Sequence, residues 1–167
     1  VNLPATKKMV PPTYRDISLT DIPVVADKAT VRILSGCYQG IRGALNGSHA
    51  RVTYLDITLP AGILWSYEEA HNNETLFIYL LEGSLIPDPE QRSIEDKGCA
   101  ILYSVSAPGE RTHEPVVVKA GAEGARFLLL AASPLREPVA WGGPIVMNTH
   151  EELRESFEEL RNGTFIK

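Results

Sequence analysis

The chain has 167 residues, a length typical of one domain that can bury a core without a disulfide or a bound metal. Its net charge of -5 argues against a protein that binds nucleic acid through the phosphate backbone, because such proteins present a basic face. No apolar run is long enough to cross a membrane as a helix. The two cysteines, Cys37 and Cys99, lack ligand-type spacing, and we expect buried thiols. We expect a cytoplasmic protein, or a nuclear one if the organism is a eukaryote.

The first 21 residues are rich in proline and predict an extended connector. Pro4, Pro11 and Pro12 each remove a backbone donor and restrict the preceding residue, which excludes a regular helix. Because the chain starts at Val1 and not at a methionine, we expect it to be either trimmed or part of something longer.

Short apolar segments separated by glycine and proline follow the connector. They predict strands at 22–26, 30–34, 52–59, 76–81, 99–105, 116–119 and 126–132. The first two segments favour a hairpin, and the alternation in 52–59 predicts a strand with one buried face. The continuous apolar run 76–81 predicts a strand covered on both faces. The run 126–132 is the most apolar, so we expect it at the centre of an all-β sandwich or barrel.

The last segment, 148–163, differs and predicts a helix. Thr149 with Glu152 three residues later forms a capping-box pattern. Apolar residues then recur at helical spacing from Leu153 onward. Gly163 supplies the left-handed stop.

Several segments occur together in an order that resembles one family. These are "TVRILSG", "YLDITLPAG" and "YLLEGS", followed by "PLREP" and "GPIVMNT" within Gly124 to Thr149, which is the most specific part. Over residues 1 to about 165 the chain resembles the C-terminal half of a pirin-like protein, a bicupin with two β-barrels. The resemblance implies an all-β, cupin-type (jelly-roll) β-barrel with one C-terminal α-helix. Residues 1–21 would be a connector packed on the barrel, residues 22–147 the barrel, and residues 148–163 a helix of the same domain.

The resemblance also implies where chemistry would lie. In pirins the metal, usually iron, sits in the N-terminal barrel, which would precede Val1. We therefore expect no metal or other cofactor in this chain, and iron or another divalent metal in full-length members of the family. Pirins are transcription cofactors in animals, and in bacteria some are quercetin dioxygenases or partners of metabolic enzymes. The expected partner is the N-terminal cupin domain, another protein or a second copy, with no direct nucleic-acid or membrane contact.

The cupin metal motif tests that expectation against the residues present. It places two histidines and a glutamate between two glycines. Counting back from Gly83, the glutamate position holds Leu76 and the histidine positions hold Glu69 and His71. Counting forward from the preceding glycine instead puts Glu74 in the carboxylate position. Neither count gives the paired histidines, so the first half of the motif is broken.

The second half of the motif is also displaced, because His113 comes one residue late. Iron oxygenases can use two histidines and one carboxylate. Residual candidates for such a set are His71, His113, Glu69 and Glu74. A metal site needs all donors to converge, each oriented by further contacts, so we favour a barrel without a metal and without catalytic residues.

Four aromatic residues are candidates for lining a small-molecule pocket. We expect Trp65, Tyr67, Phe77 and Tyr79 to cluster around the mouth of the barrel. Aromatic packing in the barrel core is the favoured alternative. Three functions remain in competition: a non-catalytic structural or partner-binding barrel, a quercetin-type dioxygenase acting mainly through an N-terminal cupin, and a module that binds a small molecule or a regulatory protein.

Overall fold

A computed structural model describes residues 1–45, 47, 49–68, 75–88, 94–103 and 115–166. The chain forms two compact units. The sheet unit consists of residues 17–47 and 51–134, and the helix unit mainly of residues 1–16 and 135–166. Within the described residues, no helix has the length and apolar character that a membrane crossing requires.

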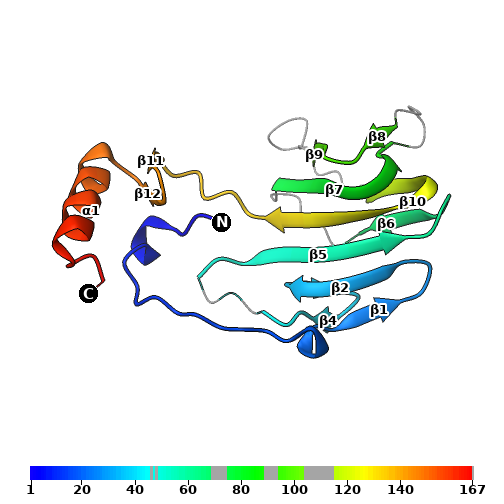
Figure 1. Cartoon of the computed structure of the whole chain (residues 1–167), viewed down its shortest axis with the longest axis horizontal. Coiled ribbons are helices and arrows are strands. Elements are labelled where there is room, and N and C mark those ends of the chain that lie inside the picture. The colour runs from blue at the N-terminus through cyan, green and yellow to red at the C-terminus, as the bar shows by residue number, and fades with distance from the viewer. Residues whose placement is uncertain (46, 48, 69–74, 89–93, 104–114, 167) are drawn as a thin grey trace. The chain divides into compact units, whose positions relative to one another are not determined.

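Among the described residues, an eight-stranded sheet forms the sheet unit (Figure 1). Its path runs β1-β2-β5-β10-β7-β8, with β6 beside β10 and β9 beside β7. Its strands are β1 (Val24–Ala26), β2 (Thr30–Ser35), β5 (Val52–Leu59), β6 (Leu64–Tyr67), β7 (Thr75–Ile86), β8 (Glu95–Asp96), β9 (Ala100–Tyr103) and β10 (Val116–Ala132). Neighbouring strands are antiparallel, and a separate ribbon pairs β3 (Cys37–Tyr38) with β4 (Ile41–Arg42).

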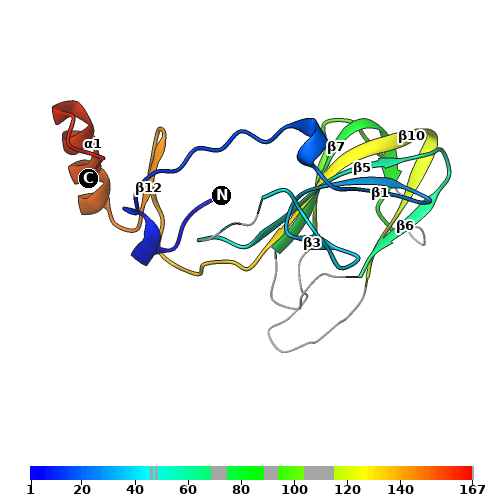
Figure 2. The ribbon, with the colours of Figure 1, turned by 90° about the horizontal axis from the view of Figure 1, so that it is seen from below.

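Strand β10 connects the two parts of this sheet. Its first residues, Val116–Lys119, pair with β6, and its second half, from Ala125 to Ala132, lies between β5 and β7. Figure 2 shows the bend that separates the two halves. A strand that changes partners along its length lets one sheet fold over its own core.

The bend is built on two glycines that approach each other. Gly124 of β10 and Gly83 of β7 have φ values of +78° and +73°, where residues with side chains are strained. The β7–β10 register shifts between Ala120 and Ala125, as in a β-bulge. A Cβ on Gly83 would lie 2.0 Å from the Gly124 carbonyl oxygen, so no side chain fits there.

The sheet encloses one apolar core. Alternation in β5 buries Leu55, Ile57 and Leu59 and turns Tyr54 and Asp56 to the other face. The largest fully buried side chains are Val31, Ile33, Leu55, Ile57, Leu59, Tyr67, Ile78, Leu80, Leu85, Val118, Phe127 and Leu129. Burying each of these contributes about 2 kcal/mol relative to leaving it in water.

Among the described residues, the helix unit contains a short 3₁₀ helix, η1 (Ala5–Lys7), a short hairpin and one α-helix. Strands β11 (Ala140–Gly142) and β12 (Ile145–Met147) pair with each other, and α1 (His150–Asn162) follows. The Thr149 hydroxyl accepts from the Glu152 amide, and the Glu152 carboxylate accepts from the Thr149 amide. Gly163 ends the helix in the left-handed conformation.

Several sequence predictions are confirmed. The hairpin of β1 and β2, the one-sided strand 52–59 and both helix caps occur as expected. The most apolar segment, 126–132, lies at the centre of the sheet between β5 and β7. The segments 116–119 and 126–132 were expected as separate strands but are one, β10, because the bulge at Gly124 bends the strand without ending it.

Other predictions differ from the structure. The expectation that 76–81 is covered on both faces is wrong, because Tyr79 is 39% exposed on the face opposite the core. Cys37 is exposed and Cys99 only partly buried, so the expectation of two buried thiols is wrong as well. The structure groups β11 and β12, which lie within segment 22–147, with α1 in one compact unit, and the predicted domain bounds stay a prediction.

Candidate functional site

The interior of the sheet unit holds a stack of aromatic rings. Trp65 lies 6.2 Å from Tyr38 and 6.2 Å from Tyr67 between ring centroids, and Phe127 meets its edge at 5.7 Å. Trp65 and Tyr67 are only 6% and 1% exposed because β6 alternates. The Trp65 Nε1–H donates to the Tyr38 hydroxyl at 3.1 Å, which satisfies the buried indole. These rings therefore fill the interior as packed core.

The β7 wall of the interior is apolar at Leu76, the carboxylate position in the count from Gly83. Leu76, Ile78 and Leu80 all point inward and are at most 3% exposed. Leu76 pairs with Ala131 of β10 on one side and Tyr103 of β9 on the other. These described positions offer no carboxylate or imidazole to a cation, so this part of the wall does not fit a metal.

The residual metal candidates are not placed by the structure. His71, Glu69 and Glu74 belong to residues 69–74, and His113 belongs to residues 104–114, all outside the described residues. Elsewhere, in the described part of the chain, no three His, Cys, Asp or Glu side chains come together as a metal site. The predictions about these four residues stay predictions.

The structure divides the four predicted pocket residues into two pairs. It brings Trp65 and Tyr67 together inside the core. Phe77 and Tyr79 alternate with Leu76 and Ile78, and so lie on the opposite face of β7. The four side chains therefore do not line one common interior site.

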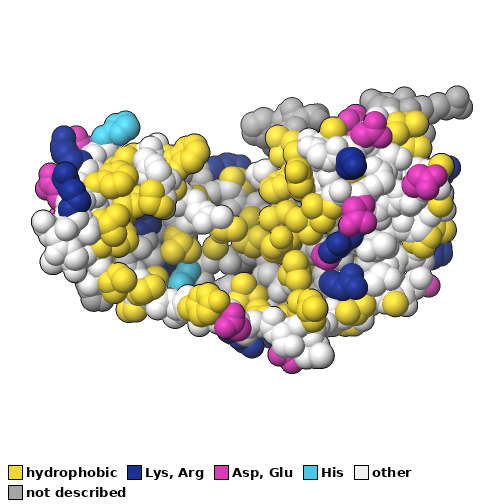
Figure 3. Space-filling model, in the orientation of Figure 1, with side chains coloured by type: hydrophobic (Ala, Val, Ile, Leu, Met, Phe, Trp, Pro, Cys, Tyr) yellow, Lys and Arg dark blue, Asp and Glu magenta, His cyan; other side chains and the backbone are white. Residues whose placement is uncertain are grey.

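Phe77 and Tyr79 instead belong to an apolar surface on the outside of the sheet. Figure 3 shows hydrophobic side chains gathered over the centre of the sheet on this side. Across the registers of β5, β10, β7 and β9, outward-facing positions meet from strand to strand. We call this surface the outer face; its apolar members are Tyr54, Phe77, Tyr79, Leu102, Leu128 and Leu130.

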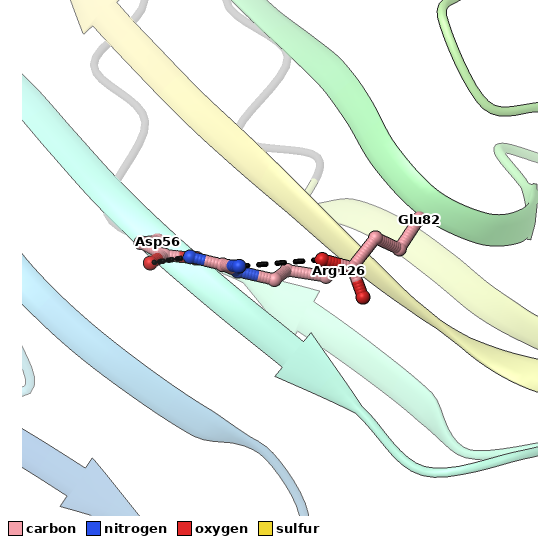
Figure 4. Close-up of polar contacts among 3 residues, drawn as sticks. All are labelled: Asp56, Glu82 and Arg126. Carbon is pink, nitrogen blue, oxygen red and sulfur yellow. Dashed lines mark hydrogen bonds and ion pairs between the residues drawn. The ribbon is translucent and has the colours of Figure 1, made fainter.

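A charged group borders the outer face. The Arg126 Nε and Nη2 groups donate to the two Asp56 carboxylate oxygens at 3.0 and 2.9 Å (Figure 4). The Arg126 Nη1 group donates to Glu82 Oε1 at 3.3 Å. The hydrogen bonds to Asp56 and its negative charge raise the pKa of the Arg126 guanidinium above its ordinary value. The Asp56 side chain is 10% exposed and that of Arg126 41%, so the bond joins a nearly buried anion to a half-exposed cation.

A second titratable group lies near the edge of the sheet unit. Burial raises the pKa of Tyr103 to about 12, and the negative charge of Asp88 acts in the same direction. The Tyr103 hydroxyl donates to the Pro87 carbonyl at 3.5 Å, a long contact. A phenol held neutral in this way is not an activated base at neutral pH.

The helix unit contains a small cavity of about 130 Å³. It is lined by Ala5, Lys8, Met9, Met147, Asn148, Glu152, Glu155, Ser156 and Glu159. Lys8 Nζ donates to the Asn2 side chain and to the Val146 carbonyl, so two of its three N–H donors are engaged. Asn148 Oδ1 is buried and finds no donor among the described residues. Because Asn148 lines the cavity, a water in the cavity would supply the missing hydrogen bond.

Comparison with known proteins agrees with this architecture. Residues 54–166 match the family described as the pirin C-terminal cupin domain. Together with the bent sheet and the single C-terminal helix, this match defines a cupin-type (jelly-roll) protein, although the paired strands of the described residues run from β1 to β8 without closing a ring. More narrowly, the chain belongs to the pirin family, which confirms the resemblance seen in the sequence.

Individual relatives set the extent of the match. The chain is 33% identical to the pirin-like protein of Caulobacter vibrioides, over 99% of this chain and 56% of that protein. It is 33% identical to pirin of Homo sapiens, over 97% of this chain and 54% of that protein. The solved structure of quercetin 2,3-dioxygenase from Acinetobacter baumannii matches with a TM-score of 0.81 at 30% identity, covering 99% of this chain and 55% of that one. The chain thus spans about half the length of the relatives it matches.

Proposed function

We propose that the chain is a non-catalytic, metal-free cupin domain of the pirin type, serving as the structural and partner-binding half of a two-barrel protein. The observation that supports this proposal is the apolar lining of the described part of the interior, where Leu76 stands at the carboxylate position counted back from Gly83 and Trp65 packs against its neighbours. A cation in such surroundings would have to lose its water without gaining ligands. Activity of a full-length pirin would then rest on iron in its other cupin, and we place the protein in the cytoplasm.

Metal content and turnover test this proposal together. We expect the purified chain to hold far less than one metal ion per molecule by inductively coupled plasma mass spectrometry. With added Fe²⁺ it should not consume quercetin. One iron per chain that is lost in His71→Ala and retained in the exposed control His150→Ala would overturn the proposal.

The rival function is a quercetin-type dioxygenase. The observation in its favour is the likeness, at 30% identity, to a solved structure that bears this name. If the chain alone consumes quercetin in the presence of iron, the activity belongs to this barrel. If only a longer protein that contains this chain consumes it, the activity belongs to the other half.

The remaining alternative is a module that binds a small or regulatory ligand near Trp65. A Trp141→Phe variant would leave Trp65 as the sole tryptophan, since the chain has two. Because Trp65 is already hydrogen-bonded and packed, we expect its emission to be unchanged by flavonols. A saturable shift in that emission would favour the binding module.

A further inference from the structure

The N-terminal connector is held in the helix unit by polar contacts. Its residues 1–16 belong to this unit. The Ala5 amide, at the start of η1, donates to Glu137 Oε2 at 2.8 Å, although the two residues are 132 positions apart in the sequence. Lys8 Nζ donates to the Val146 carbonyl at 3.1 Å. The segment that enters the sheet unit is therefore tied to the segment that leaves it.

Glu137 joins the connector to two further segments. Its Oε2 atom also accepts from Asn148 Nδ2 at 3.2 Å, and the same nitrogen donates to the Pro138 carbonyl at 2.9 Å. The backbone amide of Asn148 donates to Glu152 Oε2 at 2.9 Å, which links the network to the first turn of α1. One carboxylate oxygen thus accepts from the connector and from the residue that follows β12.

Two motifs from the most specific part of the sequence meet in this network. Glu137 belongs to "PLREP" and Asn148 to "GPIVMNT". Arg136, directly before Glu137, has a φ of +55°, where a residue with a side chain is strained. Strain of this kind persists only where the surrounding structure imposes it. The backbone that places the Glu137 carboxylate is therefore held against its local preference.

Packing contributes little to the docking of the connector. None of residues 1–16, all of which the structure describes, is buried. The cavity of about 130 Å³ lies between Ala5, Lys8 and Met9 of the connector and residues of β12 and α1, so the walls lose contacts that a filled interface would make. Segments with few buried apolar contacts are those that open locally while the rest of a protein stays folded.

We propose that Glu137 is a latch that fastens the connector to the helix unit, and that the connector leaves this unit when the latch opens while the hairpin and α1 stay folded. Glu137 is a positioning residue, because its carboxylate acts on the backbone amide of Ala5. The consequence rests on the proposed function. In a two-barrel protein the connector is the chain between the barrels, so a closed latch restricts their relative motion and an open latch releases it.

Amide hydrogen exchange followed by NMR spectroscopy tests the latch. In the unchanged chain the Ala5 amide should exchange at least about tenfold more slowly than in a free peptide of residues 1–16, because a hydrogen bond to a charged group shifts an equilibrium by about that factor or more. Glu137→Ala should raise the rate to that of the free peptide. Glu137→Gln, which keeps an acceptor oxygen, should give an intermediate rate. The matched control is Glu158→Ala, an exposed carboxylate of α1, which should leave the Ala5 rate unchanged.

The amides inside α1 distinguish an opening latch from general unfolding. They should keep their protection in Glu137→Ala, and a loss shared by α1 and the connector would overturn the proposal. An Ala5 amide that exchanges in the unchanged chain as fast as in the free peptide would overturn it as well. Metal content of the same samples tests the proposed function separately. A protected Ala5 amide in a chain with one iron keeps the latch and removes the proposed function, and an unprotected one in a metal-free chain does the reverse.

Discussion

Replacing Arg126 by methionine removes both donors from a carboxylate that has little access to water. Methionine keeps an unbranched apolar side chain against the sheet but has no charge. Asp56, whose side chain is 10% exposed, would lose its two hydrogen bonds of 3.0 and 2.9 Å. Hydrogen bonds to charged groups contribute about 1.5–3 kcal/mol, and an unpaired buried charge costs more. We expect a loss of about 2–3 kcal/mol in the free energy of unfolding.

Removing the negative charge of Asp56 should cost less stability than removing Arg126. In Asp56→Asn the guanidinium is 41% exposed, so it can turn to water and keep its contact with Glu82. We expect a loss of about 1 kcal/mol. Glu82→Gln is the matched control, because Glu82 is 70% exposed and exposed ion pairs contribute little.

Urea denaturation measures these differences. Variants are compared at one protein concentration, because self-association would make the apparent stability depend on concentration. Arg32 lies opposite Asp56 on β2 and could replace part of the lost contact, so the Arg126→Met variant is also measured with Arg32→Met. Equal losses for Arg126→Met and Asp56→Asn, or no loss in the double variant, would refute the reasoning from unequal burial.

Three further predictions concern single positions. Burial raises the pKa of Tyr103 to about 12 from its ordinary value of 10.0, so folding favours the neutral phenol. This contribution to the free energy of unfolding is present below pH 10 and is lost as the pH rises toward 12. Tyr103→Phe should therefore lose less stability between these pH values, as measured by urea denaturation. An equal loss in the variant and the unchanged chain would contradict this explanation. Gly83→Ala should destabilise the fold by about 3 kcal/mol or more, because its Cβ would lie 2.0 Å from the Gly124 oxygen; a midpoint of thermal unfolding like that of the unchanged chain would argue against so close an approach. Thr149→Ala should cost about 1 kcal/mol and reduce the helical signal in circular dichroism, and Thr149→Ser should restore most of both.

Local signals in the sequence predicted much of the fold. The capping box at Thr149 and the stop at Gly163 each depend on residues within one turn, so both ends of the helix could be predicted from the sequence. The alternation in 52–59 likewise gave the buried face of β5. The continuous apolar run 76–81 led to the wrong prediction that both faces of this strand are covered. An apolar residue that faces outward cannot be distinguished in the sequence from one that faces the core. Tyr79 is on the outside, where it joins a surface made by four strands.

The site was harder to predict than the fold. The break in the cupin motif was visible in the sequence, because neither count between the glycines gives paired histidines and the count from Gly83 puts Leu76 at the carboxylate position. The ion pair was missed, since Asp56 and Arg126 are far apart along the chain and meet only through the β5–β10 pairing. A signal was present: Asp56 is the one charged residue of segment 52–59 and Arg126 the one charged residue of segment 126–132.

The pairing of β10 also has a consequence for how the protein is made. β5 and β7 both take their central partner from residues that leave the ribosome well after them. Until then a nascent chain can pair β5 with β2 and β7 with β8 and β9, while β5 and β7 each keep one edge without its permanent neighbour. Such late, long-range closure slows folding and exposes strands that can pair with other chains. Co-synthesis with chaperones, or synthesis at low temperature, should therefore raise the yield of folded protein more than a stronger promoter would.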